Sequence, residues 1–263
     1  MKALVVFGSA SDKPVFQRLR AGLDIKKIDY DMRIASAHKT PALLDEIMQN
    51  GYDFFIAGAG LSAALPGVVA SKTPKPVVGI PVKGAFSGLD ALLSIWQMPT
   101  GIPVLGAPLE NVEEAVKFAE AYAKGLLKKI IVIERPDEKA STLAAKAEAF
   151  LKENKIEFEK QKSDFPKYNN LEAIYIDFAE VNDFNVMNRA KAAVVYVPYT
   201  RKDATANDAL KLLDAKTGLW VGLGASENAC IAAIELVNSN GKYDSFLQGY
   251  RKMIAEKVIN AKP

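Results

Sequence analysis

The stretch Ser36-Ala37-His38-Lys39-Thr40-Pro41 contains the only histidine of the 263-residue sequence. An imidazole changes charge near neutral pH, which makes His38 a candidate general acid or base. A lone histidine is more often a structural or surface residue than a catalytic one. Here, however, small residues flank it and the cationic Lys39 adjoins it. We therefore treat His38 as the candidate catalytic residue and ask which elements position it.

The segments on either side of His38 predict a strand followed by a helix. Residues 29–34 alternate and end in apolar side chains, as a strand does, and Pro41 suits the first turn of a helix. Apolar residues then recur at helical spacing up to Met48. In a parallel α/β sheet, a strand-to-helix loop opens onto the crevice at the carboxyl ends of the strands, where ligands bind.

A second motif, Gly8-Ser9-Ala10-Ser11-Asp12, follows an expected first strand over residues 1–7 and precedes an expected helix over 14–23. Glycine permits a tight turn, and hydroxyls with free N–H groups at a helix start suit an anion such as phosphate. Ser11 or Asp12 can instead be an ordinary N-cap. The motif is neither Gly-x-Gly-x-x-Gly nor a nucleotide P-loop.

A third motif, Gly58-Ala59-Gly60, follows an expected strand over residues 52–57 and leads into a small, apolar segment over 61–70. Such residues let the backbone approach a flat ligand closely. Tight packing of a helix on a sheet selects the same residue types, so both interpretations stay open at this point.

The rest of the first half completes an α/β unit. Strands are expected over 76–81 and 102–105, helices over 89–96 and 111–124, and a glycine-bracketed loop over 83–88. Five strands alternating with five helices predict a doubly wound parallel sheet for a first domain, residues 1–126.

Residues 127–263 form a second predicted domain. Strands are expected over 128–133, near Ile156, and over 173–176 and 193–197, with helices over 137–153 and 243–260. Asp90-Ala91-Leu92 recurs as Asp208-Ala209-Leu210. Four further residues recur at the same mutual spacing: Gly101, Val104, Glu110 and Asn111 match Gly218, Val221, Glu227 and Asn228. Ala107 and Ala225 also match when one of them is shifted by one place. We call these recurrences the sequence echo, and they predict a tandem repeat. The second copy is degenerate, because it has Glu134-Arg135 for Gly8-Ser9 and no histidine.

Composition limits the function classes. The chain is 49% hydrophobic and 25% charged, as in globular proteins, and it has neither a bilayer-length apolar run nor a signal-peptide pattern. A single cysteine, Cys230, excludes intrachain disulfides and fits a reducing cytoplasm. One His and one Cys argue against a zinc site of the usual ligands. The net charge of +3 comes without a basic run interleaved with aromatics, so we expect no nucleic-acid or membrane partner.

Four motifs in this order resemble the signature of the aminoimidazole ribonucleotide carboxylase family of purine biosynthesis. They are residues 8–12, residues 36–41, Ile56–Gly60 with Leu65-Pro66-Gly67, and Gly88–Ile95 with Gln97-Met98-Pro99. The resemblance covers the first half closely and the second half only as a degraded copy. It implies a flavodoxin-like fold, no metal or organic cofactor, and octamers whose sites lie between subunits.

The resemblance also implies roles for residues. The electron-rich ring carbon of aminoimidazole ribonucleotide attacks carbon dioxide and must then lose a proton, which a neutral His38 can take. Ser9 and Asp12 would hold the ribose phosphate, Lys39 would help as a point charge, and the loop from Gly58 to Gly67 would form the base and carboxylate pocket. The full set implied to bind substrate is Gly8, Ser9, Ser11, Asp12, Ser36, Ala37, Lys39, Gly58, Ala59, Gly60, Ser62, Ala64 and Leu65.

The family has two branches, and this sequence mixes their features. A mutase branch, which moves a carboxylate from the exocyclic amine to the ring carbon, has Arg after the His, a second His before Leu-Pro-Gly, and Gly-Ala where this chain has Leu61-Ser62. This chain has Lys39 and Ala64 at the first two places, as in the branch that uses carbon dioxide directly. Leu65-Pro66-Gly67 and Gln97-Met98-Pro99 are mutase-like. We favour direct carboxylation and keep the mutase as the alternative.

Two further expectations concern assembly and rival classes. If two repeats replace two subunits, a homotetramer would complete a pseudo-octamer with four competent sites. A non-catalytic nucleotide-binding protein is the rival class. A flavin or dinucleotide protein is a third possibility, suggested by fold alone.

Overall fold

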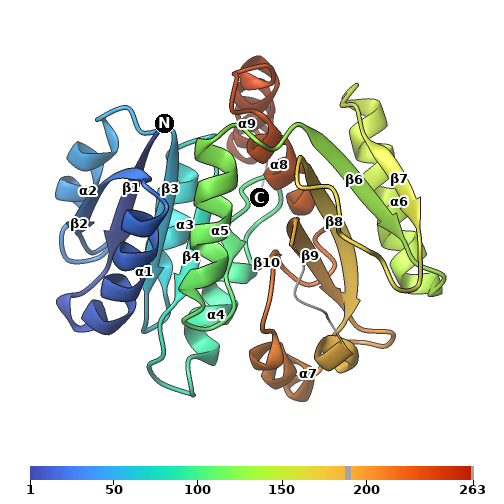
Figure 1. Cartoon of the computed structure of the whole chain (residues 1–263), viewed down its shortest axis with the longest axis horizontal. Helices are drawn as coiled ribbons and strands as arrows, with labels where there is room; N and C mark the ends of the chain where they lie inside the picture. The colour runs from blue at the N-terminus through green and yellow to red at the C-terminus, as the bar shows by residue number, and fades with distance from the viewer. Residues whose placement is uncertain (187–190, 262–263) are drawn as a thin grey trace.

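The chain, described by a computed structural model for residues 1–186 and 191–261, forms one ten-stranded sheet with helices on both faces (Figure 1). The strand order is β2-β1-β3-β4-β5-β10-β9-β8-β6-β7. Every neighbouring pair is parallel except β5 and β10, which are antiparallel. The predicted α/β class is thus confirmed, and the two halves share one continuous sheet.

The first half follows the expected alternation. Its elements are β1 (Lys2–Phe7), η1 (Ala10–Asp12), α1 (Lys13–Ile25), β2 (Asp29–Ile34), α2 (Pro41–Met48), β3 (Phe54–Ala59), α3 (Ala64–Ser71), β4 (Val77–Pro81), α4 (Leu89–Trp96), β5 (Leu105–Gly106) and α5 (Val112–Ala123). β3 begins two residues later than expected, and β5 has only two residues, placed at the end of the expected 102–105 strand.

The second half is less regular. Its elements are β6 (Lys129–Glu134), α6 (Glu138–Glu153), β7 (Glu159–Lys162), β8 (Ala173–Glu180), η2 (Val181–Val186), β9 (Ala193–Tyr199), α7 (Ala206–Lys211), η3 (Leu212–Asp214), β10 (Leu219–Trp220), α8 (Ser226–Val237) and α9 (Asp244–Ile259). The strand expected near Ile156 was misplaced. Ile156 is buried in the turn after α6, where its amide bonds the Leu151 carbonyl, and the strand begins at Glu159. Residues 163–172 connect β7 to β8 without a helix.

The two halves have the same strand order. The first half runs β2-β1-β3-β4-β5, the order of flavodoxin-like doubly wound sheets, and the second runs β7-β6-β8-β9-β10. The registers also agree: Gly79 pairs with Gly106 as Tyr196 pairs with Trp220. Gly106 and Trp220, which are thus equivalent, then pair with each other across the antiparallel junction.

This register corrects the sequence echo. The amide of Ala107 bonds the carbonyl of Gly79, and that of Val221 bonds the carbonyl of Tyr196, so Ala107 corresponds to Val221. The echo matched Val104 with Val221, three residues out of step.

Two apolar layers cover the sheet. One contains α1, α5, α6 and α8, and the other contains α2, α3 and α4. At the junction, the indole rings of Trp96 and Trp220 stack with centroids 5.0 Å apart. Aromatic stacking adds to the apolar burial that holds the halves together.

The last helix, α9, also joins the halves. Arg251 donates to the Ala70 carbonyl at 2.7 Å and pairs with the buried Glu235 of α8 at 3.4 Å. Tyr250 and Ile254 lie against Gly101. This side of α9 therefore contacts its own chain.

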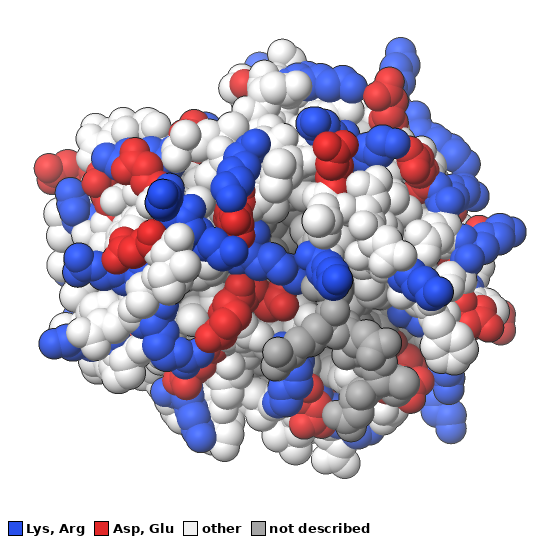
Figure 2. All heavy atoms as spheres, in the orientation of Figure 1, with Lys and Arg blue, Asp and Glu red and all other residues white. Residues whose placement is uncertain are grey.

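The surface carries charges of both signs. Figure 2 shows Lys and Arg side chains interspersed with Asp and Glu over the face in view. No helix within residues 1–186 and 191–261 is long and apolar enough to span a bilayer.

Candidate functional site

His38 lies at the apex of a tight turn between β2 and α2, and its side chain is exposed. The turn is fixed by its neighbours: the Thr40 hydroxyl accepts from the Ser36 amide at 2.9 Å and donates to the Ser36 carbonyl at 3.2 Å. The Ser36 hydroxyl accepts from the Lys39 amide at 3.2 Å. The local sequence thus holds the backbone that presents His38 and Lys39 to solvent.

The Gly8–Asp12 motif forms a second turn at the end of β1. Ser9 caps η1, with its hydroxyl accepting from the Ser11 amide at 3.2 Å and the Ser11 hydroxyl at 2.8 Å. Of the two N-cap candidates in the sequence, Asp12 stands at the N-cap position of α1 but its side chain makes no capping hydrogen bond, and Ser11 is the N-cap of neither element. Asp12 is buried, and burial raises the pKa of its carboxyl above the ordinary value.

The Asp12 carboxylate has one oxygen without a partner. Its Oδ2 is buried and makes no hydrogen bond to any described residue. An unpaired buried oxygen is costly, and such atoms are found where ligands or protonation complete the bonding. The turn therefore combines exposed hydroxyls, at Ser9 and Ser11, with a carboxyl whose Oδ1 accepts from the Ser11 hydroxyl at 3.4 Å and whose Oδ2 lacks a donor among the described residues.

The loop after β3 is the third part of the site. Ser62 is exposed and has a left-handed backbone, φ +42°, which a residue with a side chain seldom adopts. The Asp90 carboxylate, in the first turn of α4, accepts from the Ser62 amide at 2.8 Å. Asp90 Oδ1 is buried without a hydrogen-bond partner among the described residues.

The three motifs lie at one edge of the sheet. Phe7 pairs with Ile34 on one side and with Gly58 on the other, so β1, β2 and β3 end together. The Gly8 amide also bonds the Gly58 carbonyl at 3.0 Å. Gly58, Ala59 and Leu65 are buried, Gly8, Gly60, Ser36, Ala37 and Ala64 are half-buried, and Ser9, Ser11, His38, Lys39 and Ser62 are exposed.

Two residues at this edge were not predicted as site residues. Asp90 was recognised only as part of a longer family motif, and Glu110, which accepts from the Lys83 amide at 3.0 Å, lies 27 residues from its partner. An acidic residue in the first turn of a helix was the available signal for Asp90.

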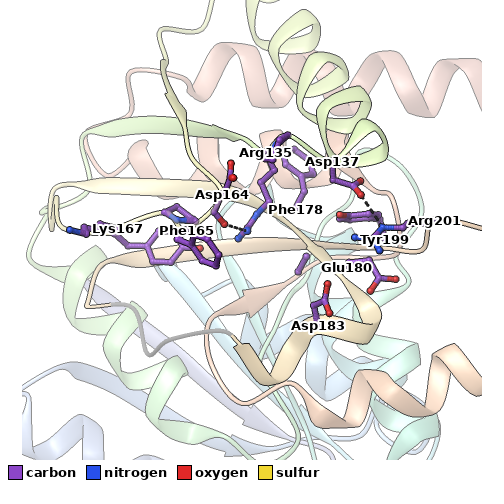
Figure 3. A pocket seen from close by; sticks show the side chains of 14 residues that line it. Arg135, Asp137, Asp164, Phe165, Lys167, Phe178, Glu180, Asp183, Tyr199 and Arg201 are labelled. Atoms are coloured by element: carbon purple, nitrogen blue, oxygen red, sulfur yellow. Dashed lines mark hydrogen bonds and ion pairs between the residues drawn. The ribbon is translucent and has the colours of Figure 1, made fainter.

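A cavity of about 520 Å³ lies at the corresponding edge of the second half, away from His38. Figure 3 shows its side chains, which come from β8, from the last residue of β9, and from segments that follow β6, β7, β8 and β9. On its Arg135 side, the guanidinium binds the fully buried Asp177 carboxylate through two bonds of 2.8 and 2.6 Å. The sequence did not predict this cavity.

No group of three or more His, Cys, Asp or Glu side chains that could hold a metal ion occurs within the described part of the chain. The first-half edge offers the imidazole of His38, the ammonium of Lys39, and hydroxyl and carboxyl groups.

Comparison with known proteins places the first half. Residues 2–130 match the family described as AIR carboxylase. N5-carboxyaminoimidazole ribonucleotide mutase of Methanocaldococcus jannaschii is 47% identical over 116 residues, which cover 44% of this chain and 74% of that protein. Chloroplastic phosphoribosylaminoimidazole carboxylase of Vigna aconitifolia is 44% identical over 115 residues, covering 42% of this chain and 21% of that protein.

A crystal structure of Treponema denticola PurE superimposes with a TM-score of 0.40 at 26% identity, covering 44% of this chain and 77% of that chain. The sequence matches are the decisive ones, because the mutase is matched over nearly three quarters of its length. They confirm what the four motifs indicated. The chain therefore belongs to the AIR carboxylase family, through its residues 2–130.

Proposed function

We propose that the first half carboxylates the ring carbon of 5-aminoimidazole ribonucleotide, a reaction of de novo purine biosynthesis, with His38 as general acid and base. The observation that carries the proposal is the turn that presents His38 at the same sheet edge as the Ser9 turn. Both names, carboxylase and mutase, occur among the relatives.

The chemistry needs one carbon–carbon bond and one proton transfer. The ring carbon, made nucleophilic by the adjacent amine, attacks the carbon of carbon dioxide, and the new carboxylate receives the displaced electron pair. The ring carbon then carries both a hydrogen and the carboxylate, and an imidazole nitrogen of His38 takes that proton to restore the aromatic ring. General base catalysis of this kind contributes about 10²–10⁴-fold.

The other implied roles follow from the same placement. Ser9 and Asp12, with the Ser11 hydroxyl, would hold the ribose phosphate end, and the ammonium of Lys39 would bind the phosphate as a point charge. The loop of Gly58, Ala59, Gly60, Ser62, Ala64 and Leu65 would receive the ring and the carboxylate, next to Gly8, Ser36 and Ala37.

Lys39 and Ala64 favour carbon dioxide over an N-carboxylated nucleotide as the donor. The mutase-like Leu65-Pro66-Gly67 lies in α3, where Gly67 packs on Met98, so it is at least partly architectural. The mutase reaction, which yields the same product, is the second candidate, supported by the names of several relatives.

The test is a carboxylation assay with aminoimidazole ribonucleotide and bicarbonate, run beside the N-carboxylated nucleotide. Turnover with bicarbonate that is lost in His38→Asn supports the carboxylase. Lys39→Ala should mainly raise KM, because this variant would bind the substrate phosphate more weakly. Turnover with the N-carboxylated nucleotide alone would make the chain a mutase. No turnover with either would support a non-catalytic nucleotide-binding protein.

We also propose that the halves arose by duplication and that four chains assemble into a pseudo-octamer with four sites. The shared strand order and the antiparallel pairing of equivalent strands support the duplication. Light scattering should give the mass of a tetramer, and a stable monomer would contradict the assembly. A cytoplasmic location and the absence of a cofactor stay predictions.

A further inference from the structure

The cavity of the second half occupies the place that the His38 edge occupies in the first half. By strand register, Arg135 corresponds to Gly8, Phe178 to Gly58, and Glu180 to Gly60. The sequence comparison, which set Glu134-Arg135 against Gly8-Ser9, was therefore one residue out of step. Three glycines are thus replaced by three large side chains, at positions where the first half has no side chain. A ligand of this cavity would be read by side chains, in a pose different from that of the first-half substrate.

The cavity has aromatic walls. Phe178 and Tyr199 are buried at the ends of β8 and β9, whereas Phe165, on the β7–β8 connection, is 83% exposed. Figure 3 shows Phe165 and Tyr199 on opposite sides of the opening. An exposed phenyl ring next to Pro166 at a cavity rim is a surface on which a flat ring can stack.

Two guanidinium groups line the cavity and retain unused donors. Of the five N–H groups of Arg135, two bind Asp177 and a third binds the Asp164 carbonyl at 3.0 Å, which leaves two without a bond to any residue that the structure describes. Arg201 binds Asp137 through Nε at 2.9 Å, and its terminal nitrogens make no hydrogen bond within the described residues. Guanidinium groups held in this way suit bidentate binding of a phosphate.

The helix that follows β6 does not supply the anion site. Asp137 caps α6 by accepting from the Ala140 amide at 3.0 Å, so a carboxylate already occupies the helix start. Asp137 is in turn paired with Arg201, which fixes the guanidinium. A phosphate would therefore bind arginine side chains of the lining and not the helix N-terminus.

Carboxylates complete the lining. Glu180 is buried and accepts from the Asn182 amide and side chain at 2.8 and 2.7 Å, and Asp183 is exposed nearby in Figure 3. Carboxylates accept hydrogen bonds from sugar hydroxyls, as acidic residues do for ribose in dinucleotide sites.

We propose that this second-half cavity binds a ribonucleoside monophosphate, with the base on Phe165, the phosphate on Arg135 and Arg201, and the ribose hydroxyls toward Glu180 and Asp183. The volume of about 520 Å³ lies in the usual range of small-molecule sites. Inorganic phosphate alone would leave the aromatic walls in water. The cavity is lined by second-half residues and is therefore separate from the His38 edge. Binding there needs no catalytic histidine and does not depend on the proposed reaction.

The test is isothermal titration of the full-length protein with adenosine monophosphate, adenosine and inorganic phosphate. Adenosine monophosphate should bind at least about tenfold more tightly than either fragment, since ring and phosphate contacts both contribute. Arg201→Ala should weaken binding at least about tenfold, and Phe165→Ala several-fold. Lys202→Ala, a neighbouring exposed lysine outside the lining, is the matched control and should bind like wild type.

The first half provides the discriminating variant. Ser9→Ala should leave adenosine monophosphate binding unchanged, whatever it does to carboxylation. Binding that is lost in Ser9→Ala but kept in Arg201→Ala would place the nucleotide at the first-half edge and overturn the proposal. The absence of binding to wild type, or equal binding by wild type and Arg201→Ala, would overturn it as well.

Discussion

Gly106 of β5 pairs with Trp220 of β10, and the two residues hold the same register position in their own halves. The pairing needs glycine on one side, because a Cβ on Gly106 would lie 2.0 Å from Cδ1 of the Trp96 ring. Trp96 is fully buried and stacks on Trp220, so it has no room to move away.

Gly106→Ala should therefore lower the free energy of unfolding by about 1–3 kcal/mol, the usual cost of overpacking a core. Urea unfolding followed by tryptophan fluorescence reports on this junction directly. Gly249→Ala is the matched control, since Gly249 lies within α9 with nothing within 4 Å of its Cβ position. That variant should gain up to about 1 kcal/mol of helix stability. Equal stability of Gly106→Ala and wild type would contradict the close contact.

The Asp90–Ser62 bond should support the proposed activity. Asp90→Ala removes the acceptor that holds the left-handed Ser62 backbone, and a hydrogen bond to a charged group is worth about 1.5–3 kcal/mol. We expect kcat/KM to fall about 10–100-fold. Asp90→Asn keeps an oxygen acceptor and should restore most of the activity. If kcat/KM of Asp90→Asn is as low as that of Asp90→Ala, the hydrogen bond from the Ser62 amide does not support the activity.

Asp12 should make stability depend on pH. Its folded pKa is raised by burial above the ordinary 3.8, so as pH rises past 3.8 the unfolded chain loses this proton while the folded chain keeps it. The contribution of Asp12 to the unfolding free energy therefore declines until the pH exceeds its folded pKa, and then stays level.

Asp12→Asn removes that decline. Urea unfolding of both proteins from about pH 4 to 8 should show the variant gaining on wild type as pH rises, with a constant difference at the top of the range. A difference that is independent of pH would mean that the folded and unfolded pKa values of Asp12 are equal.

The Arg135–Asp177 pair should be strongly coupled to folding. Asp177→Ala leaves a guanidinium without its buried partner, and breaking a buried pair costs about 3–5 kcal/mol. Glu159→Ala, which removes an exposed partner of Lys129, is the control and should cost at most about 1 kcal/mol. Replacing both residues, with Arg135→Leu and Asp177→Leu, should recover part of the loss in chemical denaturation. A loss no larger than that of the control would show that water already screens the buried pair.

Local signals made the first half predictable. The bounds of β2 and the start of α2 were predicted to the residue, because alternation over Asp29–Ile34 and Pro41 are both local features. β7 was misplaced because its sequence, Glu-Lys-Gln-Lys, carries no apolar pattern, while the nearby Ile156 does. β5 was predicted too long, since buried apolar residues at 103–105 look the same inside and outside a strand.

The site was predictable where one motif carries it and not where distant residues meet. The His38 and Gly8 turns were recognised from contiguous residues. The Asp90–Ser62 bond joins residues 28 apart, and Arg135 meets Asp177 across 42 residues, so neither could be paired without the fold. The second-half cavity was missed for the same reason: its lining comes from β8, from β9 and from segments after four separate strands.

The antiparallel junction also decides which backbone groups stay open to other molecules. Two two-residue strands, β5 and β10, shield each other, so the free borders of the sheet are β2 and β7. β7 has charged or polar side chains throughout, and β2 carries Asp29, Asp31 and Arg33. Charged borders discourage edge-to-edge pairing with other chains, which is how proteins avoid aggregation through open sheets. Because β5 and β10 pair with each other, the sheet ends in two charged strands, β2 and β7, that discourage the addition of further strands.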